Sequence, residues 1–195
     1  MSEEEARNLL NSDLKFTESD IAKLDIFRKL LLSYNARYNL ISKNTENSIW
    51  TRHILDSAQL VKYINFDFKG NLADFGTGAG FPGIVLAIFN KNPEFHVKLY
   101  EKSPVKREFL SKIKDKLSIK VEIRENIFDS YIEANIVVAR AFKKIGQIIQ
   151  ISREKIKKPH KIIILKGKNA QTEINNVSLG SNYSYKMEKS ITDVD

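Results

Sequence analysis

From residue 71 onwards, short apolar runs alternate with longer segments of helical periodicity. Two runs, Ile-Val-Val-Ala at 136–139 and Ile-Ile-Ile-Leu at 162–165, have no polar interruption, which is typical of parallel strands covered on both faces. The predicted strands are 71–75, 96–101, 119–124, 135–139, 161–165 and 183–190, and the predicted helices are 82–91, 104–117, 143–157 and 169–177. We therefore expect an α/β fold with a mostly parallel sheet and right-handed crossovers.

The first 66 residues contain no convincing strand. Helical spacing predicts one helix over 3–11, a second that begins after Thr17 and a third over about 46–64. Thr17, with Asp20 three positions on, resembles a shortened capping box. We expect a single domain over residues 1–195, with a helical extension over 1–66 and a ligand-binding α/β core over 67–195.

A glycine-rich segment follows the first predicted strand. Four of the eight glycines lie within residues 76–83, and Pro82 suits the first turn of the next helix. Glycine allows positive φ and leaves room for a ligand against the backbone, and open α/β folds bind ligands at this edge of the sheet. Glu101 ends the next predicted strand, where a carboxylate can accept both ribose hydroxyls of an adenosine. The alternative is a tight turn followed by a surface glutamate.

Two cofactor classes fit such a loop. A nicotinamide dinucleotide places its pyrophosphate on the helix N-terminus. S-adenosylmethionine (SAM) has no phosphate, and its amino-acid part packs closely on the glycines. Asp74 precedes Gly76 and Gly78 and favours SAM, because a carboxylate there can help to hold the ligand's ammonium group.

The composition excludes several other classes of protein. There are no cysteines, and the three histidines lie far apart, so we expect no disulfide, cysteine nucleophile or metal site. The net charge of +8 favours a polyanionic partner, although the genome's base composition would also enrich lysine. We expect no membrane-spanning helix, because the apolar runs are short, and the acidic N-terminus is unlike a signal peptide. These features predict a cytoplasmic protein.

The chain resembles the RsmG family, also called glucose-inhibited division protein B, from about Tyr38 to Ile174. The segments that carry the resemblance are Tyr38-Asn-Leu-Ile41, His53-Ile-Leu-Asp-Ser57, Asp74–Gly83, Lys106-Arg-Glu-Phe-Leu110, Ala139-Arg-Ala-Phe142 and Lys166-Gly-Lys168. The resemblance implies a Rossmann-like class I methyltransferase fold. It also implies transfer of a methyl group from SAM to N7 of a guanine in bacterial 16S ribosomal RNA, with S-adenosylhomocysteine released.

The resemblance also implies roles for individual residues. Gly76 and Phe81 match loop positions that contact SAM, and Glu101 matches the ribose position. Glu125 and Asn126 match the pair that flanks the adenine, although the family usually has Glu where this chain has Asn126. Arg140 matches an arginine at the end of the fourth strand. Relatives continue into a final antiparallel strand beyond the position of Asp195, so we expect this strand to be missing or the edge to be built differently.

The chemistry agrees with the residues independently. Guanine N7 carries a lone pair and no proton, so its methylation needs alignment rather than a general base. Rival RNA methylations use a cysteine nucleophile, an Asn/Asp-Pro-Pro-aromatic motif or an acidic residue near the fourth strand, where this chain has Ala139-Arg-Ala-Phe142. The Arg140 guanidinium is suited to hydrogen-bond guanine O6 or a phosphate.

Each of the other candidate residues has an ordinary structural role as its alternative. His53 and Asp56, three residues apart on a predicted helix, form either a stabilising polar pair or part of the cofactor or RNA pocket. Lys166 and Lys168 follow a predicted strand at the ligand edge and contact RNA or only solvent. Phe142 stacks on the target base or, as we favour, packs in the core.

Our sequence hypothesis is a guanine-N7 methyltransferase that acts, most simply as a monomer, on 16S ribosomal RNA or a precursor of the small subunit. Two alternatives stay open. One is an RNA-binding assembly factor with an inactive methyltransferase core, and the less favoured one is a nicotinamide-dependent oxidoreductase.

Overall fold

The computed structural model describes residues 1–180 and 183–193. At its centre lies a five-stranded parallel sheet in the order β3-β2-β1-β4-β5. The strands are β1 (Gly70–Phe75), β2 (Phe95–Tyr100), β3 (Val121–Arg124), β4 (Ile136–Arg140) and β5 (Lys161–Leu165). Phe75 lies opposite Tyr100, so the chain leaves β1 and β2 at the same edge of the sheet. The predicted α/β fold and five of the six predicted strands are confirmed.

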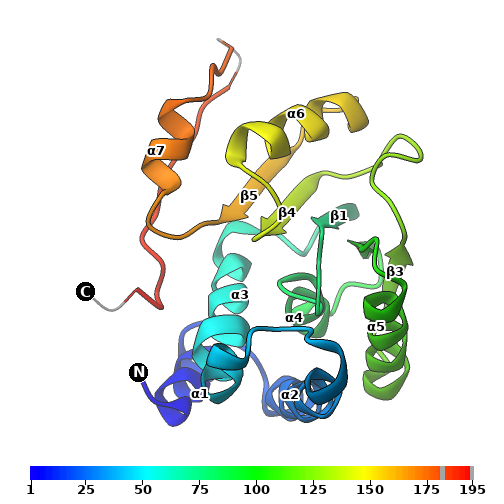
Figure 1. The fold of residues 1–195 in the computed structure, drawn as a ribbon, viewed down its shortest axis with the longest axis vertical. Helices are drawn as coiled ribbons and strands as arrows, with labels where there is room; N and C mark the ends of the chain where they lie inside the picture. Colours follow the sequence, from blue (N-terminus) through cyan, green and yellow to red (C-terminus); the bar gives the residue numbers. More distant parts are fainter. Residues whose placement is uncertain (181–182, 194–195) are drawn as a thin grey trace.

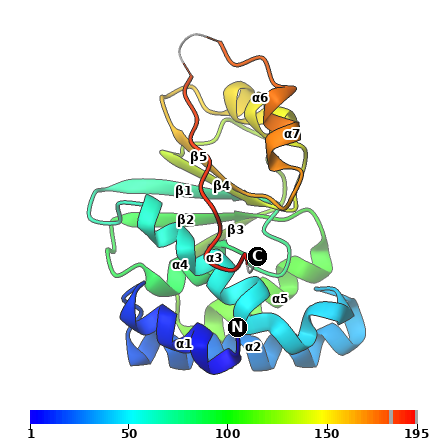
Figure 2. The ribbon, with the colours of Figure 1, turned by 90° about the vertical axis from the view of Figure 1, so that its left-hand side faces the viewer.

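Helices cover both faces of the sheet (Figures 1 and 2). They are α1 (Glu3–Ser12), α2 (Glu18–Tyr38), α3 (Asp56–Ala58), α4 (Gly83–Phe89), α5 (Pro104–Leu117), α6 (Ile145–Lys155) and α7 (Ala170–Asn175). On one face lie α3, α4 and α5, with α1 and α2 as an outer layer, whereas α6 and α7 lie on the other. Alternation along β1 explains this arrangement. Leu72 packs in the apolar cluster between the sheet and α4 and α5, whereas Ala73 packs in the cluster between the sheet and α6.

The N-terminal helices are joined to the core by aromatic packing. The predicted capping box of α2 is present, with Thr17 and Asp20 each bonding to the other's backbone. Further along α2, the ring of Phe27 lies 5.0 Å from that of Phe81 and 6.4 Å from that of Phe109. Helix α2 therefore supports the turn that follows β1.

The prediction of one regular helix over 46–64 is wrong. The region is built from a 3-10 turn η1 (Lys43–Ser48), a π-helical turn η2 (Trp50–Leu55), the short α3 and a second 3-10 turn η3 (Gln59–Tyr63). The Arg52 carbonyl accepts a hydrogen bond from Arg140, so the side chain of a distant strand satisfies a backbone group of the wider π turn. Such turns are frequent at functional sites.

The predicted strand at 183–190 is also wrong, because this segment makes no ladder with β5. Residues 183–189 are exposed, so no apolar face is buried that would fix a strand register. The segment runs from α6, where the Arg153 guanidinium lies 4.0 Å from the centre of the Tyr183 ring, to α3, where Ser190 meets Asp56 (Figure 2). Polar side chains therefore anchor it.

Candidate functional site

The turn between β1 and α4 exposes backbone at the carboxyl edge of the sheet. Gly76, Gly78 and Gly80 have φ values of 70°, 61° and 101°, which side chains rarely adopt. A Cβ on Gly76 would lie 2.3 Å from the Phe142 ring, so this glycine is required by packing. A Cβ on Gly78 would meet nothing closer than a backbone oxygen at 3.9 Å. The space above Gly78 is therefore open to a ligand.

The Asp74 side chain lies under this turn and bonds to its backbone. Its Oδ2 accepts a hydrogen bond of 2.8 Å from the Gly83 N–H, which ties the end of β1 to the start of α4. The side chain is fully buried, and Oδ1 has no hydrogen-bond partner among the described residues. Burial raises the pKa of Asp74 to about 7. The structure thus places Asp74 under the loop, in contact with its backbone, and its predicted contact with a ligand ammonium stays a prediction.

The raised pKa of Asp74 predicts a pH-dependent stability. In the unfolded chain the group ionises near its ordinary pKa of 3.8, whereas the folded protein keeps the proton up to about pH 7, so its contribution to the free energy of unfolding falls as pH rises through that window. Asp74→Asn keeps an acceptor for Gly83 and cannot ionise. Within this window we expect the free energy of unfolding of the variant to rise relative to that of the wild type by up to about 1.4 kcal/mol per pH unit. Urea unfolding of both proteins at about pH 4.5 and pH 7.5 measures the difference. A difference that does not change with pH would contradict the assignment.

Glu101 links the glycine turn to the next strand and helix. One carboxylate oxygen accepts a 3.0 Å bond from the Gly78 N–H, and the other accepts a 2.8 Å bond from the Ser103 N–H at the start of α5. Arg107 donates to the Glu101 carbonyl at 3.1 Å and pairs with Glu125 at 3.3 Å. The structure therefore brings the predicted ribose residue directly to the glycine backbone. Sequence reasoning missed Arg107, although it lies in a segment that carries the family resemblance.

The predicted adenine-side pair lies beyond β3. Glu125 is exposed and contacts Arg107, and Asn126 donates a 3.0 Å bond to Asp129 within its own loop. Both follow the strand next to β2 and so lie at the same edge as Glu101.

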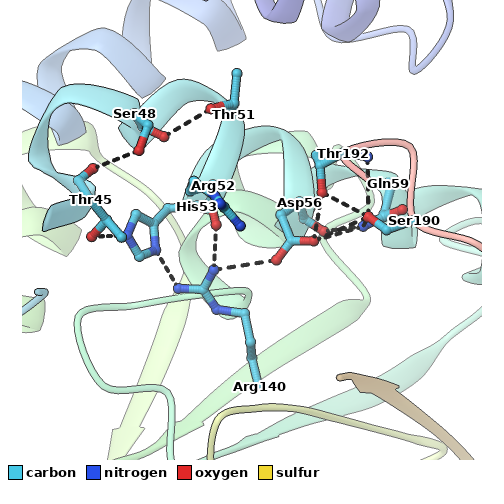
Figure 3. Close-up of polar contacts among 10 residues, drawn as sticks. All are labelled: Thr45, Ser48, Thr51, Arg52, His53, Asp56, Gln59, Arg140, Ser190 and Thr192. Atoms are coloured by element: carbon cyan, nitrogen blue, oxygen red, sulfur yellow. Dashed lines mark hydrogen bonds and ion pairs between the residues drawn. The ribbon is translucent and has the colours of Figure 1, made fainter. Parts of the chain in front are cut away.

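A second group of polar side chains surrounds Arg140 at the end of β4 (Figure 3). Its Nη1 donates to the Arg52 carbonyl at 2.9 Å and lies 3.4 Å from Asp56 Oδ2, and its Nη2 lies 2.6 Å from His53 Nδ1. The buried Phe81 ring joins this group to the glycine turn, because it stacks on the His53 ring at 5.1 Å and lies 5.1 Å from the guanidinium. The predicted residues His53, Phe81 and Arg140 thus form one cluster.

His53 is neutral in this cluster. Burial, together with the positive charges of Arg140 and Arg52, lowers its pKa to about 3. Because the guanidinium only donates, Nδ1 must accept, so Nε2 carries the proton and donates to Thr45 Oγ1 at 2.8 Å. A histidine with this pKa orients Arg140 and is a poor general base near neutral pH.

The predicted RNA-binding lysines and Phe142 occupy different settings. Lys166 is engaged internally, donating to the Lys143 carbonyl at 2.9 Å and to Glu173 at 3.0 Å, whereas Lys168 is exposed. Phe142 is partly buried, packs over Gly76 and meets the Phe75 ring edge-on at 6.4 Å, as favoured for a core residue.

Among the described residues, no three His, Asp or Glu side chains gather as metal ligands would. Nor does any helix within the described ranges have the length and apolar character needed to cross a membrane.

Comparisons with known proteins agree on one family. The sequence model described as GidB, rRNA small subunit methyltransferase G, matches residues 20–194. The ribosomal RNA small subunit methyltransferase G of Rickettsia akari is 39% identical over 173 residues, covering 88% of both chains. Its namesake from Pelagibacter ubique is 33% identical over 182 residues, covering 90% of this chain and 84% of the relative.

Solved structures share the fold at low sequence identity. Precorrin-6y C5,15-methyltransferase from Geobacter metallireducens superposes with a TM-score of 0.51 at 16% identity and covers 71% of both chains. Coclaurine N-methyltransferase superposes with a TM-score of 0.50 at 15% identity, over 83% of this chain and 58% of that one.

Proposed function

Because the chain belongs to the rRNA small subunit methyltransferase G family, we propose that it transfers the methyl group of SAM to N7 of a guanine in 16S ribosomal RNA, releasing S-adenosylhomocysteine. The observation that carries this proposal is the direct contact between the two halves of the site. The Phe81 ring lies against both His53 and Arg140, so the glycine turn and the guanidinium are one aromatic ring apart.

The residues around the glycine turn fit SAM. The open space over Gly78 admits a ligand to the backbone, and Asp74 Oδ1 is a buried polar atom without a partner among the described residues under the same turn. Each Glu101 oxygen accepts one bond in the structure and has a second lone pair for a ribose hydroxyl. Glu125 and Asn126 would flank the adenine. When bound, SAM supplies an electrophilic methyl group on a positively charged sulfur.

Arg140 is suited to hold the RNA. Its three contacts use both N–H groups of Nη1 and one of Nη2, which leaves the Nε–H and one Nη2–H free of these bonds. Two such donors match guanine O6 or a phosphate oxygen. No side chain has to remove a proton, since N7 has none, and the low pKa of His53 accords with that requirement. Arg140 therefore aligns the base.

The wider surface supports an RNA partner. The net charge of +8 attracts a polyanion, and Lys168 is exposed just after β5 at the ligand edge, with Lys166 holding the base of that loop. The target base must be unstacked to reach the site, so a precursor particle or partly stripped subunit in the cytoplasm is the proposed substrate. The protein is proposed to act as a monomer.

The test is transfer of radiolabelled methyl from SAM to small-subunit RNA that lacks its own modification, followed by identification of the labelled nucleoside. We expect label in 7-methylguanosine. Label in another nucleoside would overturn the N7 assignment and retain the methyltransferase. No label, with an active relative transferring under the same conditions, would favour an RNA-binding assembly factor. Membership of a methyltransferase family argues against the nicotinamide-dependent alternative, and calorimetry with SAM and NAD separates the two directly.

A further inference from the structure

The C-terminal segment meets the site through a compact set of polar contacts (Figure 3). Ser190 Oγ and Thr192 Oγ1 each lie 3.4 Å from Asp56 Oδ1. Gln59 donates to the same oxygen at 3.0 Å and to Ser190 Oγ at 2.9 Å, and it accepts a 3.0 Å bond from the Ile191 N–H. The segment is therefore fixed to α3 and η3 by both backbone and side chains.

The two oxygens of Asp56 face different parts of the chain. Oδ1 receives the donors of Gln59, Ser190 and Thr192, whereas Oδ2 faces Arg140 Nη1 at 3.4 Å. A planar carboxylate cannot turn one oxygen without moving the other. The direction in which Oδ2 points at the guanidinium is thus set by the groups bonded to Oδ1.

The Asp56 contact is the one through which Arg140 is most easily displaced. At 3.4 Å it is longer than the 2.9 Å bond to the Arg52 carbonyl and the 2.6 Å contact with His53. A small rotation of the carboxylate would break it and leave the guanidinium held by the Arg52 carbonyl and His53 alone. Catalysis by alignment is sensitive to displacements of this size.

We propose that Gln59, Ser190 and Thr192 are positioning residues of the methyl-transfer site, which act through Asp56 to aim the Arg140 guanidinium. This inference rests on the proposed function of Arg140. It gives the C-terminal segment a part in catalysis although it lies outside the glycine turn and the strand ends.

The first test removes both hydroxyls with Ser190→Ala/Thr192→Val. We expect kcat for methyl transfer to fall about 10-fold, with the SAM dissociation constant changed less than about 2-fold. The conservative Ser190→Thr/Thr192→Ser variant keeps both hydroxyls and should retain most of kcat. Ser184→Ala, an exposed serine of the same segment, is the matched control and should behave as wild type. A lowered melting temperature with unchanged kcat would overturn the proposal, because the segment would then be only an anchor.

A double-mutant cycle tests the route through Asp56. Asp56→Asn removes the charge that faces Arg140, so loss of the Ser190 and Thr192 hydroxyls in that background should change kcat less than about 2-fold. An equal loss of kcat in both backgrounds would overturn the route.

A measurement independent of activity keeps this test separate from the proposed function. His53 Nδ1 touches Arg140, and the chain has three histidines, so its imidazole resonances can be assigned by substitution. Ser190→Ala/Thr192→Val should shift the His53 resonances and leave those of His96 and His160 in place. Unshifted His53 resonances would overturn the inference even in an active enzyme. If the wild type transfers no methyl group, a shifted His53 would still support the positioning of Arg140 while the proposed function fails.

Discussion

Replacing Arg140 with alanine is expected to lower kcat for methyl transfer by about 100-fold, which corresponds to about 2.7 kcal/mol of transition-state stabilisation. The guanidinium is held by the Arg52 carbonyl, His53 and Asp56, and the donors that make none of these bonds are the ones proposed to meet the substrate. Alanine removes these donors and leaves His53 and Asp56 without their common partner. Single-turnover transfer at saturating SAM and RNA measures the effect on the chemical step.

Two further variants serve as comparisons for Arg140→Ala. Arg140→Lys keeps the charge but loses the planar fork, so it should recover about 10-fold of the lost rate at most. Arg28→Ala, on α2 and 4.0 Å from Glu3, removes an arginine away from the site and should stay within about 2-fold of wild type. An Arg140→Ala enzyme with nearly wild-type kcat would show that the guanidinium only supports the fold.

Gly76→Ala is expected to weaken SAM binding by about 100-fold and to lower the free energy of unfolding by about 2 kcal/mol. The residue has φ of 70°, where an alanine is strained, and its Cβ would lie 2.3 Å from the Phe142 ring. Relief of that collision must move either the ring or the turn that carries Gly78. Titration calorimetry with SAM and urea unfolding measure the two effects.

A second substitution separates the two causes of the Gly76→Ala effect, which are the collision with the Phe142 ring and the strain of positive φ. Phe142→Leu in the Gly76→Ala background removes the ring and should restore part of the stability, while the strain of positive φ remains. Gly146→Ala, within α6, adds the same methyl group in a helix and should leave SAM affinity unchanged. Wild-type SAM affinity in Gly76→Ala would contradict the assignment of the turn as the cofactor cradle.

The parts of the fold that the sequence predicted are those with local physical causes. Buried parallel strands need continuous apolar residues, so β4 and β5 were visible as Ile-Val-Val-Ala and Ile-Ile-Ile-Leu. The capping box at Thr17 lies within four residues, and the glycines at 76–80 mark backbone that needs positive φ. Each signal is complete within a short stretch of chain.

The parts that could not be predicted depend on distant or backbone partners. The π turn at 50–55 keeps nearly helical spacing, and its distinguishing contact is a carbonyl bonded to Arg140, 88 positions away. Residues 183–190 alternate as a strand does, yet the side chains of 183–189 are exposed and the anchoring bonds at Ser190 and Thr192 reach residues on η3 and α3. Sequence spacing carries no information on such pairings. The division into a 1–66 extension and a 67–195 core stays a prediction.

The polar cluster on α3 also bears on the order in which the protein assembles. Asp56 meets Arg140 across 84 positions and Thr192 across 136, so its contacts close two long loops. Loop closure of this length follows local folding, and synthesis proceeds from the N-terminus. A nascent chain can therefore build the glycine turn, β1 and β2 well before Thr192 leaves the ribosome. Asp56, which faces the Arg140 guanidinium, acquires the donors of Ser190 and Thr192 only after that stage, so the glycine turn can form before the polar cluster around Asp56 is complete.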